Sequence, residues 1–79
     1  MRLDKFLKIS RIIKRRTVAN EICSQGRVQI NDKVAKPGTE VKVGDIIKIQ
    51  FGEQLKQYEV LSIAEHVTKD DAEKLYREI

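Results

Sequence analysis

The chain contains one cysteine, Cys23, and one histidine, His66, among its 79 residues. One cysteine cannot form an internal disulfide, and this pair cannot build a four-ligand Cys/His metal cage. A chain of this length buries only about 60% of the surface that its unfolded form exposes. The sequence therefore predicts one small domain that is held together by side-chain packing alone. Its core is too thin for a deep substrate pocket, which argues against most enzymes and against a bound metal or cofactor.

The composition indicates a soluble globular domain. Hydrophobic residues make up 41% of the chain and charged residues 35%, which is too apolar for a disordered chain and too charged for a membrane span. The first five residues lead directly into a charged helical pattern, without the apolar stretch of a secretory signal peptide. We therefore expect a cytoplasmic protein.

The charges divide the chain into two unequal halves. Residues 1–36 hold ten Lys or Arg against three Asp or Glu, whereas residues 37–79 hold six against nine. Such asymmetry points to a polyanionic partner, either a nucleic acid or an anionic membrane surface. A merely solvated helix face is the alternative, but a surface built for solubility intersperses both signs. Seven cations near the N-terminus recur at intervals of mostly three, and their spacing predicts a stripe along a helix: Arg2, Lys5, Lys8, Arg11, Lys14, Arg15 and Arg16.

Two helices are expected in the basic half. Residues 3–13 carry apolar side chains at helical spacing on the side opposite the cations, so this face should pack against the rest of the domain. A sheet over that face would leave no apolar surface for a membrane. Residues 16–24 predict the second helix, with Gly26 placed to end it.

A small, mostly antiparallel sheet is expected to follow, which makes the fold class α+β. Val28 to Ile30 alternates apolar and polar side chains, as a strand does. Asn31-Asp32 suits a tight reversal, after which residues 33–36 can return as a short second strand. Residues 46–51 and 55–61 predict a second hairpin across Gly52-Glu53. From Thr68, which begins a capping-box pattern, apolar side chains at helical spacing predict a short C-terminal helix.

No arrangement of residues points to catalysis. His66 has no evident nucleophile beside it, so we interpret it as a surface or loop residue. We interpret Cys23 as a small core residue. A binding module is therefore favoured. One candidate is an adaptor whose basic face docks an acidic protein. The other is an RNA-binding protein, and because the chain has only four aromatic residues, such a protein would contact phosphates rather than stack bases.

Four short runs together resemble the S-four RNA-binding domain, which is named after the fourth protein of the small ribosomal subunit. They are residues 2–7, 15–19, 26–31 and 43–46. The chain departs from the family pattern at Arg15, where the family often has serine, and at Asp32, where it often has glycine. The resemblance implies that residues 1–66 form a two-helix RNA-binding motif, called the αL motif, packed on the small sheet. Residues 67–79 would be a short helical extension.

The whole pattern is similar to that of the stand-alone bacterial members of this family that act in ribosome quality control, relatives of the small ribosome-associated heat-shock protein. That similarity implies a non-enzymatic monomer. It would bind large-subunit rRNA and tRNA or peptidyl-tRNA on obstructed large ribosomal subunits, and would support alanine tailing by a partner factor. The implied RNA-binding residues are Arg2, Asp4, Lys5, Lys8, Arg11, Arg15, Arg16 and Thr17, with Lys14, Arg27 and Lys33 as weaker candidates. Another stand-alone protein that binds structured RNA is the remaining alternative.

Overall fold

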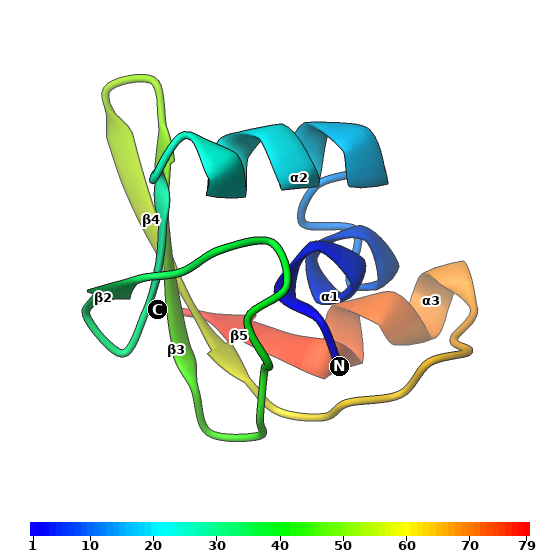
Figure 1. The fold of residues 1–79 in the computed structure, drawn as a ribbon. Helices are drawn as coiled ribbons and strands as arrows, with labels where there is room; N and C mark the ends of the chain where they lie inside the picture. The colour runs from blue at the N-terminus through cyan, green and yellow to red at the C-terminus, as the bar shows by residue number, and fades with distance from the viewer.

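The computed structural model describes all residues from 1 to 79 as two layers, with the helices on one side of a single sheet (Figure 1). The elements follow the order α1 (Leu3–Ile9), α2 (Arg16–Ser24), β1 (Val28–Ile30), β2 (Lys33–Val34), β3 (Ile46–Phe51), β4 (Gln54–Val60), α3 (Lys69–Ala72), a 3₁₀ turn (Glu73–Leu75) and β5 (Tyr76–Glu78). The strands lie in the order β2-β1-β3-β4-β5, and every neighbouring pair is antiparallel. The predicted α+β class is confirmed.

The core lies between the helices and the sheet. Leu3, Phe6 and Leu7 of α1 are fully buried, and they share one hydrophobic cluster with Ile47 and Ile49 of β3. The expectation that the sheet covers the apolar face of the first helix is therefore confirmed. Cys23 is also buried, and burial raises the pKa of its thiol to about 11, so it is the small core residue that the sequence predicts.

The first helix is shorter than its apolar pattern predicts. It ends at Ile9 rather than near residue 13. Ser10 is fully buried, and its hydroxyl donates to the carbonyl oxygen of Leu7 at 3.3 Å, which offers the backbone an alternative to helical bonding. Arg11 then adopts a left-handed conformation with φ 63°. The seven cations therefore do not form one helical stripe, because the chain turns away after α1.

The second helix has the predicted bounds, Arg16–Ser24. Gly26, with φ 74°, donates its N–H to the carbonyl oxygen of Cys23, and Arg27 donates to that of Ile22. This pair of bonds is the Schellman motif, in which a residue without a Cβ is preferred. The prediction that Gly26 ends the helix is confirmed.

The hairpin between β1 and β2 forms without the glycine that is usual at its turn. Asn31 and Asp32 have φ values of 52° and 68°, as both central residues of a type I′ turn require. The side chain of Asn31 accepts from the backbone N–H of Ile46 and donates to Asp45, both at 3.0 Å. These bonds attach the turn to the start of β3.

The C-terminal segment is helical only over its first part. Thr68 caps α3 by accepting from the backbone N–H of Asp71, as the capping pattern predicts. Tyr76–Glu78, which the spacing placed in a helix, instead pairs with β4 as β5. The ring of Tyr76 meets that of Tyr58 edge to face, with centroids 5.4 Å apart, so pairing and packing at the sheet edge override the local helical pattern.

None of the helices is both long enough and apolar enough to cross a membrane.

Candidate nucleic-acid interface

Asp4 is the buried centre of a polar cluster at the start of α1. Its N–H donates to the carbonyl oxygen of Pro37 at 3.1 Å, and the neighbouring Leu3 donates to Thr39 at 2.8 Å. The backbones of Arg2 and Glu40 pair as an isolated antiparallel β-bridge. The loop before β3 thus fixes the first turn of α1, and with it the position of the Asp4 carboxylate.

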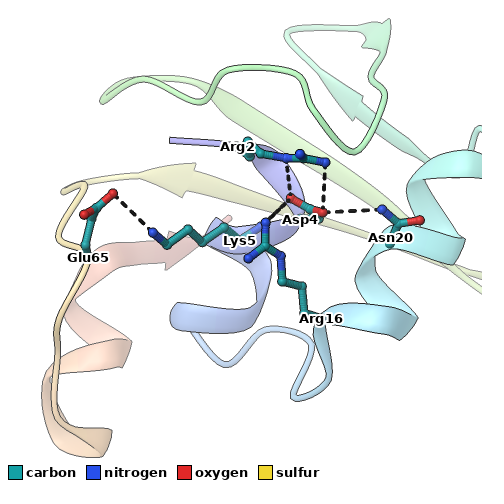
Figure 2. Close-up of polar contacts among 6 residues, drawn as sticks. All are labelled: Arg2, Asp4, Lys5, Arg16, Asn20 and Glu65. Atoms are coloured by element: carbon teal, nitrogen blue, oxygen red, sulfur yellow. Dashed lines mark hydrogen bonds and ion pairs between the residues drawn. The ribbon is translucent and has the colours of Figure 1, made fainter.

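Two arginines and an asparagine converge on this carboxylate (Figure 2). Arg2 donates from Nε to Oδ1 at 3.2 Å and from Nη2 to Oδ2 at 3.4 Å, and Asn20 Nδ2 donates to Oδ2 at 3.4 Å. Arg16 Nη2 lies 3.6 Å from Oδ1 as an ion pair. We call Arg2, Asp4, Arg16 and Asn20 the Asp4 cluster.

The cluster joins two helices and leaves guanidinium groups open to solvent. Arg16 and Asn20 stand four residues apart on α2, and so on one face of it. The side chain of Asp4 is 3% exposed, whereas those of Arg2 and Arg16 are 55% and 47% exposed. Each guanidinium carries five N–H donors in a planar fork. Asp4 therefore orients both arginines while their remaining donors can contact an external anion.

The surroundings of Asp4 keep it ionised. Burial by itself raises the pKa of Asp4, but the other influences together lower it below its ordinary value. They are the hydrogen bond from Asn20, the charges of Arg16 and Arg2, and the backbone N–H of Lys5. A carboxyl group whose pKa is lowered by folding stabilises the native state at pH values above its unfolded pKa.

Asp4→Asn should therefore lower the free energy of unfolding at pH 7 by about 1.5 to 3 kcal/mol, the range for hydrogen bonds to a charged group. As the pH falls below about 4, through the lowered pKa of Asp4, wild type should lose this advantage. Urea unfolding of both proteins between pH 7 and pH 2 measures the difference. Asp71, whose pKa is also lowered, is present in both and cancels. A gap that persists unchanged at pH 2 would contradict this role for Asp4.

The structure separates the predicted residues into two groups. Lys5 donates to Glu65 at 3.2 Å, which partly neutralises it and divides the Asp4 cluster from the cations of the α1–α2 turn. Lys8 and Arg11 are exposed and, with Lys14, line a cleft against residues 65–68.

Arg15 and Thr17 are exposed at the start of α2. Arg15 is the residue before the helix and makes no side-chain cap, so the first N–H groups of α2 have no partner from that side chain. Thr17 lines a shallow depression with Asp4, Arg16 and Asn20. Thr17 therefore lies beside the Asp4 cluster, and Arg15 directly precedes Arg16 of that cluster in the chain.

Among the weaker candidates, Arg27 is committed elsewhere. Its Nε and Nη2 donate to the carbonyl oxygen of Gln50 at 3.1 and 2.8 Å, which leaves fewer donors for an anion. Lys33 lies exposed on β2, away from the cluster. Sequence reasoning missed Asn20, although its spacing of four from Arg16 was a usable signal.

Comparison with known proteins assigns the chain to a family. The model of the S4 domain matches residues 1–47, which include both helices and the whole Asp4 cluster. A Halalkalibacterium halodurans protein named RQC P-site tRNA stabilizing factor is 55% identical over 76 residues, covering 96% of this chain and 86% of that protein. The Bacillus subtilis protein of the same name is 46% identical, covering 96% of this chain and 88% of that protein.

The fold has a solved counterpart in the trimeric heat shock protein 15 of Vibrio cholerae. The two superpose with a TM-score of 0.90 at 32% identity, covering 100% of this chain and 81% of the other. Sequence and structure agree, and the chain belongs to the S4 domain family, together with the small bacterial proteins named RQC P-site tRNA stabilizing factor.

Proposed function

We propose that this protein is a non-catalytic RNA-binding factor of bacterial ribosome quality control, which stabilises tRNA on obstructed large ribosomal subunits. In this proposal it contacts tRNA or peptidyl-tRNA and large-subunit rRNA, and it acts in the cytoplasm as a monomer. It supports C-terminal alanine tailing of the stalled peptide by a partner factor. The names of the relatives support the tRNA role, and the observation that carries the RNA-binding role is the pair of arginines oriented by buried Asp4.

The oriented arginines suit phosphate groups of structured RNA. A guanidinium fork can grip two phosphate oxygens, and a fork already held in place loses less entropy on binding. Asp4 provides that holding contact, through hydrogen bonds to Arg2 and an ion pair with Arg16. Aromatic side chains offer little to bases here, because Phe6 and Tyr58 are buried and Phe51 and Tyr76 are partly buried against the core. Recognition therefore rests on the geometry of phosphates rather than on stacked bases.

The proposed RNA face consists of side chains from α1, the α1–α2 turn and the start of α2. Its members are Arg2, Lys5, Lys8, Arg11, Arg15, Arg16 and Thr17, with Asp4 as a positioning residue. In this proposal residues 1–66 are the RNA-binding domain, and residues 67–79 are an extension that adds α3 and β5 to it.

Crosslinking in cells tests the proposal. Tagged wild-type protein should recover large-subunit rRNA together with tRNA, because the proposed face contacts both. Lys56→Ala, which changes an exposed cation on β4 that is not part of the proposed RNA face, should recover the same RNAs. Recovery of protein partners alone, unchanged by RNase, would contradict the proposal and favour an adaptor. Recovery of tRNA without large-subunit rRNA would remove the rRNA contact.

A further inference from the structure

A cleft of about 620 Å³ lies between the α1–α2 turn and residues 65–68 of the loop that follows β4. Lys8, Arg11 and Lys14 line one side, and His66 lies on the other. The loop side falls outside residues 1–47, which match the S4 domain. The cleft is therefore built partly from a segment that the family match does not cover.

The charge of the cleft is positive and largely uncompensated. None of Lys8, Arg11 and Lys14 takes part in an ion pair in the structure. The one carboxylate in the lining, Glu65, bonds to Lys5 Nζ at 3.2 Å (Figure 2). Three cations thus face a cavity whose only anion already has a partner outside the lining, which is an arrangement suited to a bound anion.

The backbone gives an independent reason to assign a role to Arg11. Arg11 has φ 63° directly after the end of α1, at a position where glycine is usual because the left-handed region strains residues with a Cβ. Backbone strain of this kind concentrates at functional sites. The chain keeps a long cation where the fold alone would favour glycine, and that cation lines the cleft.

A second hollow lies between the cleft and the Asp4 cluster. Its lining includes three cations, Arg2, Lys5 and Arg16, and the carboxylate of Glu40, and Glu65 lines both hollows. The Lys5–Glu65 pair therefore lies between two groups of cations on one side of the molecule. A polyanion with regularly repeated charges could reach both groups at once.

We propose that this cleft is a second phosphate-binding site, which takes a backbone phosphate of the bound RNA separately from the Asp4 cluster. The inference rests on the proposed function and adds the loop around His66 to the RNA-binding surface. Lys8, Arg11 and Lys14 supply the charge, and His66 supplies a ring N–H. Thr68 is not a ligand, because its hydroxyl already bonds to Asp71.

Arg11→Gly and Arg11→Lys test the site on large ribosomal subunits that carry peptidyl-tRNA. Arg11→Gly removes the cation and relieves the backbone, so affinity should fall about tenfold, as for a lost charge-assisted contact, while the midpoint of thermal unfolding rises. Arg11→Lys keeps the charge and should retain most of the affinity. A rise in stability with unchanged affinity would overturn the site, because that result would show that Arg11 strains the backbone without contributing to binding.

The salt dependence of binding gives a second readout. With four to six cations engaged, the wild-type slope of log K against log salt should be roughly −3 to −5. Arg11→Gly should make the slope shallower by about 0.7 to 0.9, the contribution of one phosphate contact. The Lys56→Ala control should change neither slope nor affinity.

His66 reports on the cleft directly, since it is the only histidine and its ring C–H at the ε1 position gives one resolved signal in NMR spectra. Titration of the wild-type protein with purified tRNA should shift or broaden that signal. Saturation with tRNA that leaves it unmoved would overturn the second site while the Asp4 cluster, followed through the Arg2 and Arg16 side-chain signals, still responds. Silence of all three signals would instead overturn the proposed function, and this inference with it.

Discussion

Replacing Arg16 with alanine should weaken binding to obstructed large ribosomal subunits at least tenfold, whereas replacing Lys56 should leave binding nearly unchanged. Arg16 is held 3.6 Å from buried Asp4 and is about half exposed, so its free donors are positioned for phosphate. Losing a charge-assisted contact costs about 1.5 to 3 kcal/mol, which corresponds to a tenfold or greater loss. Lys56 lies on β4 in the acidic half of the chain.

The stability of both variants is the necessary control. Asp4 retains Arg2, Asn20 and the Lys5 N–H when Arg16 is removed. The ion pair with half-exposed Arg16 should contribute only about 1 kcal/mol or less to folding. Melting curves of the two variants should therefore stay close to wild type. Equal co-sedimentation of Arg16→Ala and Lys56→Ala with large subunits would refute the assignment of Arg16.

The sequence predicted those helices and turns whose ends depend on the conformational preferences of a few neighbouring residues. The α2 helix has the expected bounds because Gly26 can adopt the left-handed conformation that closes it. The β1–β2 hairpin forms because Asn31 and Asp32 both accept positive φ values. Where the turn residues themselves favour the required φ values, the sequence was sufficient to predict the turn.

Tertiary contacts decided the elements that were mispredicted. Ile12 and Ile13 continue the apolar spacing of α1, yet the buried Ser10 ends the helix before them. Tyr76 continues the spacing of the C-terminal helix, yet it pairs with Val60 at the sheet edge. Neither the burial of a serine nor the pairing of a strand 16 residues away along the chain is visible in a local pattern.

The sequence singled out Arg2, Asp4 and Arg16, but it indicated neither Asn20 nor the arrangement of the four side chains. Asp4 was expected among the RNA-binding residues, with orientation of an arginine as its suggested role, and the structure places it between Arg2 and Arg16. The single helical stripe of cations was wrong, because the left-handed Arg11 redirects the chain. The cleft beside His66 was not predicted, since its two sides are brought together only by the packing of the C-terminal segment.

Alanine tailing in a reconstituted system tests the central claim most directly, because it asks whether the arginines held by Asp4 carry the function. The protein alone should extend no peptide. Added to obstructed large subunits with the tailing factor and alanyl-tRNA, it should raise the number of alanines attached, because a tRNA held in place lowers the entropic cost of each step. Replacing Arg2 and Arg16 together by alanine should abolish the gain.

The design must separate lost binding from lost folding. Without both arginines, the buried carboxylate of Asp4 has no cation beside it, and an uncompensated buried charge destabilises a protein. Adding Asp4→Asn to the double variant removes that charge and should restore the melting temperature but not the gain in tailing. Lys56→Ala should support tailing like wild type. The gain in tailing is expected only where the two arginines remain, and an undiminished gain with the folded triple variant would contradict the role of the two arginines.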